Sequence, residues 1–264
     1  MINGINMAEV GIDGSVEVGI AGCMDPRTFE ARRKRMEQLR KIYGKNVVFF
    51  AFSNGGGNVK GFRRSLMQVI DAKEANVAAI YAMQHEDCAA MKIVKEAIDN
   101  RKNPGKEVMD TLVSQFYEAD LSDVDKTNSR KQIEELQTLT RGRSIDVEAA
   151  YISKADMTER VHEHSAVMIL DPFYIDYSGI ADKLKVDLGG MYVLQTFRNP
   201  EDFIPDLGIL RSLDFKKVTV VELDGNKEMY DKAAKLVENA GMKAESMRME
   251  LPQKTQNHHK KSRI

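Results

Sequence analysis

Short apolar segments, each followed by an amphipathic stretch, constrain the fold of this 264-residue chain more than any other feature of its sequence. Residues 16–22 (VEVGIAG), 46–52 (NVVFFAF) and 77–83 (VAAIYAM) are apolar almost throughout. Strands that are apolar on both sides are typical of a parallel sheet that helices cover on both faces. We therefore expect an α/β fold with a parallel-sheet core, in which ligands bind beyond the carboxyl ends of the strands.

The segments between these strands are predicted to be helices and turns. Apolar residues at helical spacing predict helices at residues 28–43, 59–72 and 88–100, and one or two polar helices within 106–142. The glycine-rich segment 53–58 (SNGGGN) is expected to form a tight turn after the second strand. A fourth strand is predicted at residues 147–153.

The second half of the chain weakly repeats the first. Residues 166–171 resemble the first strand, 191–197 the second, and 217–224 with the helix at 227–240 the third. These matches predict an internally duplicated chain with a degenerate second half. Its domains would be residues 1–163 and 164–252, followed by a basic, disordered tail at 253–264. The alternative is that strand–helix units resemble one another without a duplication.

Charge and hydropathy exclude several classes of partner. The formal net charge is -1, so no strong positive field attracts nucleic acid or an anionic membrane. No apolar run approaches the roughly 18 residues that span a bilayer. The N-terminal segment lacks the basic start and apolar stretch of a signal peptide. We therefore expect a cytoplasmic protein that binds neither nucleic acid nor membranes.

The two cysteines of the chain lie at or near predicted strand ends. Cys23 follows the first strand, and His85 and Cys88 follow the third. Catalytic zinc sites use three nitrogen or sulfur ligands and keep a fourth position for water. If the two strands are neighbours, the three side chains meet and predict a Zn2+ site. The alternative is that both cysteines are small residues buried in the core.

The motifs around these residues resemble the signature of the β-class carbonic anhydrase family. Residues 23–27 (CMDPR) match CxDxR, an Asn-Gly turn follows the second strand, and residues 85–88 (HEDC) match HxxC. The resemblance covers about residues 15–160. It implies that Cys23, His85 and Cys88 bind zinc, and that Asp25 and Arg27 form a catalytic dyad beside it. The implied reaction is the reversible hydration of carbon dioxide to bicarbonate and a proton, which makes the chain a zinc lyase.

The residue types suit that reaction. Bound zinc lowers the pKa of its water to about 7 and so provides a hydroxide nucleophile. Arg27 can hold Asp25 in a two-pronged ion pair, which leaves Asp25 ionised and able to orient the nucleophile. In this family the same aspartate can also swing onto the zinc and close its fourth position. The alternative for this pair is an ordinary surface salt bridge.

The glycine turn is the candidate site for the substrate. Gly56 and Gly57 allow close backbone approach, and amide groups there are predicted to bind bicarbonate. The alternative is a simple tight turn. Two residues depart from the family pattern, since Ser53 stands where an arginine is common and Ala89 where a glycine is common. These departures concern the shape of the pocket more than the metal.

The second half carries none of this chemistry. Ile169 and Phe173 stand near the places of Cys23 and Arg27, and no cysteine follows Cys88. The family generally forms dimers in which the partner lines each pocket. A degenerate repeat could therefore make the chain a pseudo-dimer with one site, the alternative being a homo-oligomer.

Two other functions stay open at this stage. The same zinc site could hydrolyse carbonyl sulfide or carbon disulfide, which are linear like carbon dioxide. A degenerate second half also allows a non-catalytic structural or regulatory protein, although a structural zinc needs four ligands and no dyad. His162 and His164 are candidates for a proton shuttle, with ordinary surface histidines as the alternative.

Overall fold

The computed structural model of the chain describes residues 15–72, 75–99, 122–159, 164–223 and 227–249. The expected tail at 253–264, His162 and the helix expected before residue 122 lie outside these residues. The first half contains β1 (Glu17–Cys23), α1 (Phe29–Tyr43), β2 (Val48–Asn54), α2 (Val59–Ile70), β3 (Val77–His85), α3 (Ala89–Asp99), α5 (Val124–Leu139) and β4 (Asp146–Ile152). The second half contains β5 (Ser165–Ile169), α6 (Tyr177–Leu184), β6 (Met191–Gln195), α7 (Ile204–Ser212), β7 (Lys217–Leu223), α8 (Lys227–Asn239) and β8 (Lys243–Met249).

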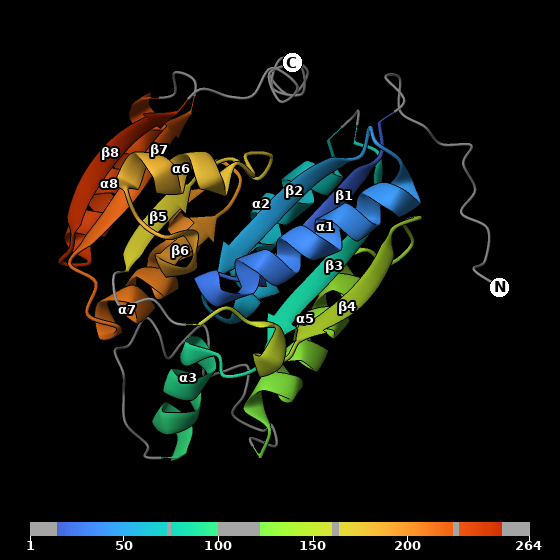
Figure 1. Cartoon of the computed structure of the whole chain (residues 1–264), viewed down its shortest axis with the longest axis horizontal. Coiled ribbons are helices and arrows are strands. Elements are labelled where there is room, and N and C mark those ends of the chain that lie inside the picture. The colour runs from blue at the N-terminus through green and yellow to red at the C-terminus, as the bar shows by residue number, and fades with distance from the viewer. Residues whose placement is uncertain (1–14, 73–74, 100–121, 160–163, 224–226, 250–264) are drawn as a thin grey trace.

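One sheet of eight strands runs through both halves (Figure 1). The strand order is β4-β3-β1-β2-β6-β5-β7-β8, so the order of the second half mirrors that of the first. Neighbouring strands are parallel within each half, but β2 and β6 pair in antiparallel fashion where the halves meet. The structure thus confirms an α/β fold with a mostly parallel sheet, and adds one antiparallel junction that the apolar strand pattern did not indicate.

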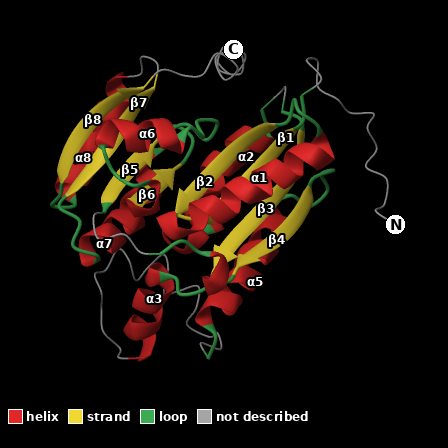
Figure 2. Ribbon diagram, in the orientation of Figure 1, coloured by secondary structure: helices red, strands yellow, loops and turns green. Residues whose placement is uncertain are grey.

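Helices cover both faces of the sheet (Figure 2). On β2, Phe49 and Ala51 share an apolar cluster with residues of α1, whereas Phe50 and Phe52 share one with residues of α2 and α5. Successive side chains of a strand point to opposite faces, so a strand covered on both sides must be apolar at consecutive positions. In the second half, α6 packs on one face of the sheet and α7 and α8 on the other.

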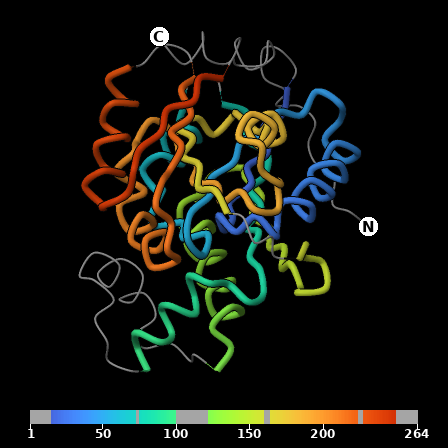
Figure 3. The backbone as a smooth tube through the Cα atoms, turned by 60° about the vertical axis from the view of Figure 1, so that its left-hand side comes forward, coloured from blue at the N-terminus to red at the C-terminus, as the bar shows by residue number. Residues whose placement is uncertain are grey.

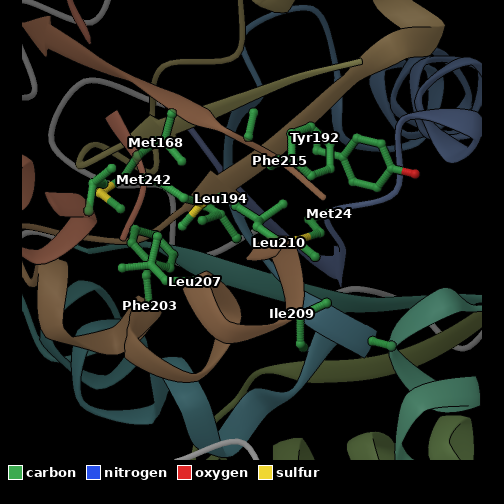
Figure 4. Packing of buried hydrophobic residues seen from close by; sticks show 14 of the residues in the cluster. Met24, Met168, Tyr192, Leu194, Phe203, Leu207, Ile209, Leu210, Phe215 and Met242 are labelled. Carbon is green, nitrogen blue, oxygen red and sulfur yellow. The ribbon is translucent and has the colours of Figure 1, made fainter. Parts of the chain in front are cut away.

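Met24 joins the two halves immediately after the first strand. Its N–H donates to the carbonyl of Asn54 at 2.8 Å, and its carbonyl accepts from the N–H of Val193 in β6 at 3.2 Å. The Met24 side chain lies beside Leu210 of α7 (Figure 4). Met24, the residue after Cys23, is therefore hydrogen-bonded to β2 through its N–H and to the second half through its carbonyl.

The predicted strands are present, and each of their ends lies within two residues of the predicted end. The difference matters at the carboxyl ends, because β1 extends to Cys23 and β3 to His85. The elements α6, α7 and β8 were not predicted. The exposed, mostly polar pattern of β8 explains its omission, since an edge strand need not be apolar on both sides. Every helix among the described residues is too short or too polar to cross a membrane.

We predict that a chain ending at residue 163 loses solubility. Cys23, Met24 and Cys88 belong to one apolar cluster with Leu194, Leu210 and other residues of the second half, and truncation would expose that surface. Each large apolar side chain in such a cluster stabilises the fold by about 2 kcal/mol when buried. The test compares soluble yield and gel-filtration profile with those of the full chain. A truncated chain that is monomeric and as soluble as the full one would contradict the prediction.

Candidate metal centre

The sheet brings Cys23 and His85 to neighbouring strand ends. Each is the last residue of its strand, and β1 and β3 pair in parallel with Gly22 opposite Met83. Cys88 directly precedes α3, three residues beyond His85. The adjacency of the two strands, on which the sequence prediction depended, is therefore observed.

The ligand atoms of Cys23, His85 and Cys88 lie within 4.8 Å of one another. The two sulfur atoms are 3.7 Å apart. Two thiolates bound to one tetrahedral zinc at about 2.3 Å would lie about 3.8 Å apart. This spacing therefore suits a shared ion.

His85 presents a nitrogen that suits a metal. Its Nδ1 lies 2.7 Å from the carbonyl oxygen of Glu86, which assigns the proton of a neutral ring to Nδ1. Its Nε2 is buried and has no hydrogen-bond partner in the protein. A buried polar atom without a partner is costly, and histidine ligands commonly use their second nitrogen in this way. The residues present therefore fit a metal ion.

The cysteines and the histidine influence one another's ionisation. The hydrogen bond with Cys88 lowers the pKa of the Cys23 thiol in spite of burial, and His85 lowers it further. The same contact with Cys23, together with burial, raises the pKa of Cys88. Burial by itself would lower the pKa of His85, but the interaction with Cys23, the charge of Asp25 and the hydrogen bond to the Glu86 carbonyl together outweigh it, and the pKa is raised. Such a cluster favours a cation at its centre.

Asp25 and Arg27 form a buried, two-pronged ion pair. The Arg27 Nε lies 3.0 Å from Asp25 Oδ1, and Arg27 Nη2 lies 2.6 Å from Asp25 Oδ2. The Arg27 backbone N–H also donates to Asp25 Oδ1 at 3.0 Å. Burial alone would raise the pKa of Asp25, but the Arg27 hydrogen bonds and the charge of His85 lower it. The pair is therefore buried and charged, unlike a surface salt bridge.

Arg27 also reaches the turn between His85 and Cys88. Its Nη1 donates to Asp87 Oδ2 at 3.0 Å, and its Nη2 donates to the Asp87 carbonyl at 3.0 Å. Asp87 adopts a left-handed conformation with φ of 57°, while Ala89 starts α3 and has no positive φ. The turn thus takes its unusual backbone conformation at Asp87, and an alanine after Cys88 causes no strain.

The glycine turn is packed on all sides. Gly56 and Gly57 have φ of 68° and 61°, and a Cβ at these positions would overlap Met91 and Gln84. The Gly55 N–H donates to Asp206 Oδ1 at 2.7 Å. Glycine is therefore required here for conformation and for close packing. Bicarbonate binding by Gly56 and Gly57 stays a prediction.

Asp206, in α7, is a site residue that the sequence did not reveal. Only 3% of it is exposed, and burial raises its pKa to about 8. Its partner Gly55 is 151 residues away in the chain, so no local signal connects them. Gln84, Asn128 and Gln132 were also missed. The two α5 residues are polar and four apart on one helix face, a spacing that pattern analysis could have noted.

His164 and Ile169, which the sequence also singled out, do not belong to this cluster. His164 is exposed at the start of β5 and packs edge-on against Tyr192, with ring centroids 5.7 Å apart. Ile169 is fully buried in the core of the second half. Within the described residues, only Cys23, His85 and Cys88 form a group that could hold a metal.

Comparison with protein families, curated proteins and solved structures gives no match to this chain.

We predict that Cys88→Ser reduces zinc affinity by about a hundredfold or more, since it removes a direct ligand and even an outer-shell change costs 10–100-fold. A serine hydroxyl is neutral near pH 7 and does not replace a thiolate. Zinc per chain is measured by elemental analysis after dialysis against a weak chelator, with Cys23→Ser expected to behave alike. Full zinc content in both variants would show that the cysteines only fill the core.

We predict that Asp206→Asn stabilises the protein increasingly between pH 5 and pH 7.5. The folded state keeps the Asp206 proton up to about pH 8, whereas an unfolded aspartate loses it near pH 4. The contribution of this proton to the free energy of unfolding is complete below about pH 4. It decreases by about 1.4 kcal/mol per pH unit as the pH rises to about 8. Asparagine can still accept from Gly55 and does not titrate.

Urea unfolding of the variant and the wild type at both pH values measures the difference. The difference in the free energy of unfolding should grow by roughly 3 kcal/mol between pH 5 and pH 7.5. Asp214→Asn, at a side chain that is 83% exposed, serves as the control and should show no such trend. A pH-independent difference for Asp206→Asn would mean that the carboxyl group is ionised in the folded protein.

Proposed function

We propose that the chain is a zinc-dependent carbonic anhydrase of the β class, which hydrates carbon dioxide reversibly to bicarbonate and a proton. The observation that supports this most is the combination, at one edge of the sheet, of a buried Cys23–His85–Cys88 cluster with a buried Asp25–Arg27 pair. A metal site that serves only structure needs four ligands and has no use for a dyad.

Zinc suits the donor atoms better than other common ions. Two thiolates and one imidazole favour zinc over magnesium, calcium or manganese, which prefer oxygen. Zinc held by three protein ligands would supply Lewis acidity, which makes water acidic enough to serve as a nucleophile near neutral pH.

The protein's own residues would orient the reactants. Asp25 is ionised at neutral pH and can accept a hydrogen bond from water with the lone pairs that Arg27 leaves free. Arg27 fixes the rotamer of Asp25 and also joins it to Asp87, so the carboxylate cannot rotate freely. The apolar residues beside the cysteines, such as Met24, Met91 and Ile209, exclude water and suit a small, nonpolar substrate.

The second half would serve as a built-in partner. The mirrored strand order supports an internal duplication, in which β5, β6, β7 and β8 correspond to β1, β2, β3 and β4. The copy lacks ligands but supplies β6 and α7, which pack against Met24 and Gly55. This gives a pseudo-dimer with one site per chain.

Carbonyl sulfide and carbon disulfide are the second candidate substrates. They are linear and at most weakly polar, so the same apolar surroundings suit them. Parallel assays with the three substrates decide between them, because the same nucleophile would attack the carbon of each and only the relative rates differ.

We predict that the zinc-loaded protein hydrates carbon dioxide and that Asp25→Ala lowers kcat by about a hundredfold, the lower range for a residue that directs proton transfer. Stopped-flow hydration with a pH indicator, from neutral to mildly alkaline pH, measures both. Asp231→Ala, at an exposed position of α8, is the control for a lost aspartate. A fully zinc-loaded wild type without activity on any of the three substrates would refute the proposed reactions.

A further inference from the structure

The helix α5 places polar side chains against the metal centre. It lies between β3 and β4 in the chain, packs on β3, and contacts α3 at the carboxyl edge of the sheet (Figure 1 and Figure 3). Asp125, Asn128 and Gln132 are spaced by three and four residues and so share one face of the helix. Asn128 and Gln132 are each only 2% exposed, which is uncommon for an amide side chain.

Asn128 and Gln132 anchor α5 to the glycine turn. Asn128 Nδ2 donates to the Gly56 carbonyl at 2.8 Å and to Gln84 Oε1 at 3.0 Å. Gln132 Oε1 accepts from the Val59 N–H at 2.8 Å, and its Nε2 donates to Asn128 Oδ1 at 2.8 Å. These bonds fix both the position and the rotation of the helix relative to the strand ends.

With the helix fixed in this way, Asp125 reaches the turn between His85 and Cys88. Its Oδ2 accepts from the Asp87 N–H at 2.9 Å. Asp87 is the residue in the left-handed conformation, which aspartate adopts only at some cost. The carboxylate stabilises that conformation by accepting the Asp87 N–H, which the turn directs toward it.

We propose that Asp125 is a positioning residue of the metal centre, and that α5 is the element that holds it in place. The carboxylate fixes the turn between His85 and Cys88, and so sets the direction of the Cys88 sulfur toward the metal. This inference rests on the proposed metal centre. It assigns a role to the segment between β3 and β4, which the signature motifs leave without one.

Outer-shell groups of this kind change metal affinity through the ligands that they orient. Arg27 holds the Asp87 carbonyl and carboxylate, while Asp125 holds the Asp87 N–H. Loss of Asp125 removes the partner of that N–H, so that the turn is held only by Arg27 and by the bonds of Glu86 to Ile152 and Lys154 in the described part of the chain. The ligand sulfur is then less preorganised, and binding a metal must order it.

The test measures zinc affinity by competition with a chromophoric chelator, for the full-length protein and four variants. Asp125→Ala should bind zinc 10–100-fold more weakly, as for other outer-shell changes. Asp125→Asn keeps one acceptor oxygen and should recover part of the affinity. The visible spectrum of the cobalt-substituted protein should show altered thiolate-to-cobalt bands in Asp125→Ala.

Two further variants separate positioning from general stability. Leu39→Ala leaves a cavity in an apolar cluster that contains none of the metal-centre residues and should lower the melting temperature of the metal-free protein, yet keep zinc affinity within about threefold of the wild type, less than an outer-shell effect. Gln137→Ala, at an exposed position of α5, should change neither.

The outcomes are distinct. Wild-type affinity in Asp125→Ala overturns the inference but leaves the proposed function intact. An equal loss of affinity in Leu39→Ala and Asp125→Ala also overturns it, since the effect is then general destabilisation. A wild type that binds no zinc overturns the metal centre and this inference together. If Asp125→Ala does not fold, a several-fold loss in Asp125→Asn supports positioning, and wild-type affinity there opposes it.

Discussion

Burial of charge at the carboxyl ends of β1 and β3 is the constraint on which the rest of the site depends. Cys23, Asp25, His85 and Cys88 are each only 2% exposed. Charged groups so far from water are tolerated only when they are paired and hydrogen-bonded. Arg27 meets this need, because a guanidinium group carries five N–H donors in a fixed plane and can serve two acceptors at once. By bonding to Asp25 and to the turn before Cys88, it couples the two loops, so that neither moves alone.

The surroundings of the site come from both halves of the chain. The first half contributes α5, whose Asn128 side chain donates a hydrogen bond to the Gly56 carbonyl of the glycine turn. The second half contributes α7, whose Asp206 binds the Gly55 N–H. A glycine turn without side chains is thus held by polar groups from two helices, and the packing around it leaves no room for a larger residue. The half that has no ligands is therefore part of the site's architecture.

The sequence predicted the clustering of Cys23, His85 and Cys88 better than the surroundings of the cluster, for physical reasons. Cys23, His85 and Cys88 follow apolar strands, and neighbouring parallel strands end at one edge, so local pattern and topology sufficed. Asp206 was missed because its position depends on the antiparallel junction of β2 and β6, a long-range pairing without a local signal. Asn128 was missed because a polar stripe on a helix has the same periodicity whether water or other polar groups satisfy it. The left-handed turn at Asp87 was missed as well, since aspartate, unlike glycine, seldom indicates a positive φ.

The order of elements along the chain has a consequence for biosynthesis. Cys23, His85, Cys88 and the whole of α5 precede β4, whereas β6 and α7, which cover Cys23 and Gly55, come after it. Ribosomes make the N-terminal part first, and early parts of a chain begin to fold before later ones exist. The nascent protein therefore exposes two thiols and an imidazole to the surrounding solution while their cover is still being translated. A metal ion bound by these side chains would enter most easily in that interval, because β6 and α7 cover Cys23 and Gly55 in the finished fold.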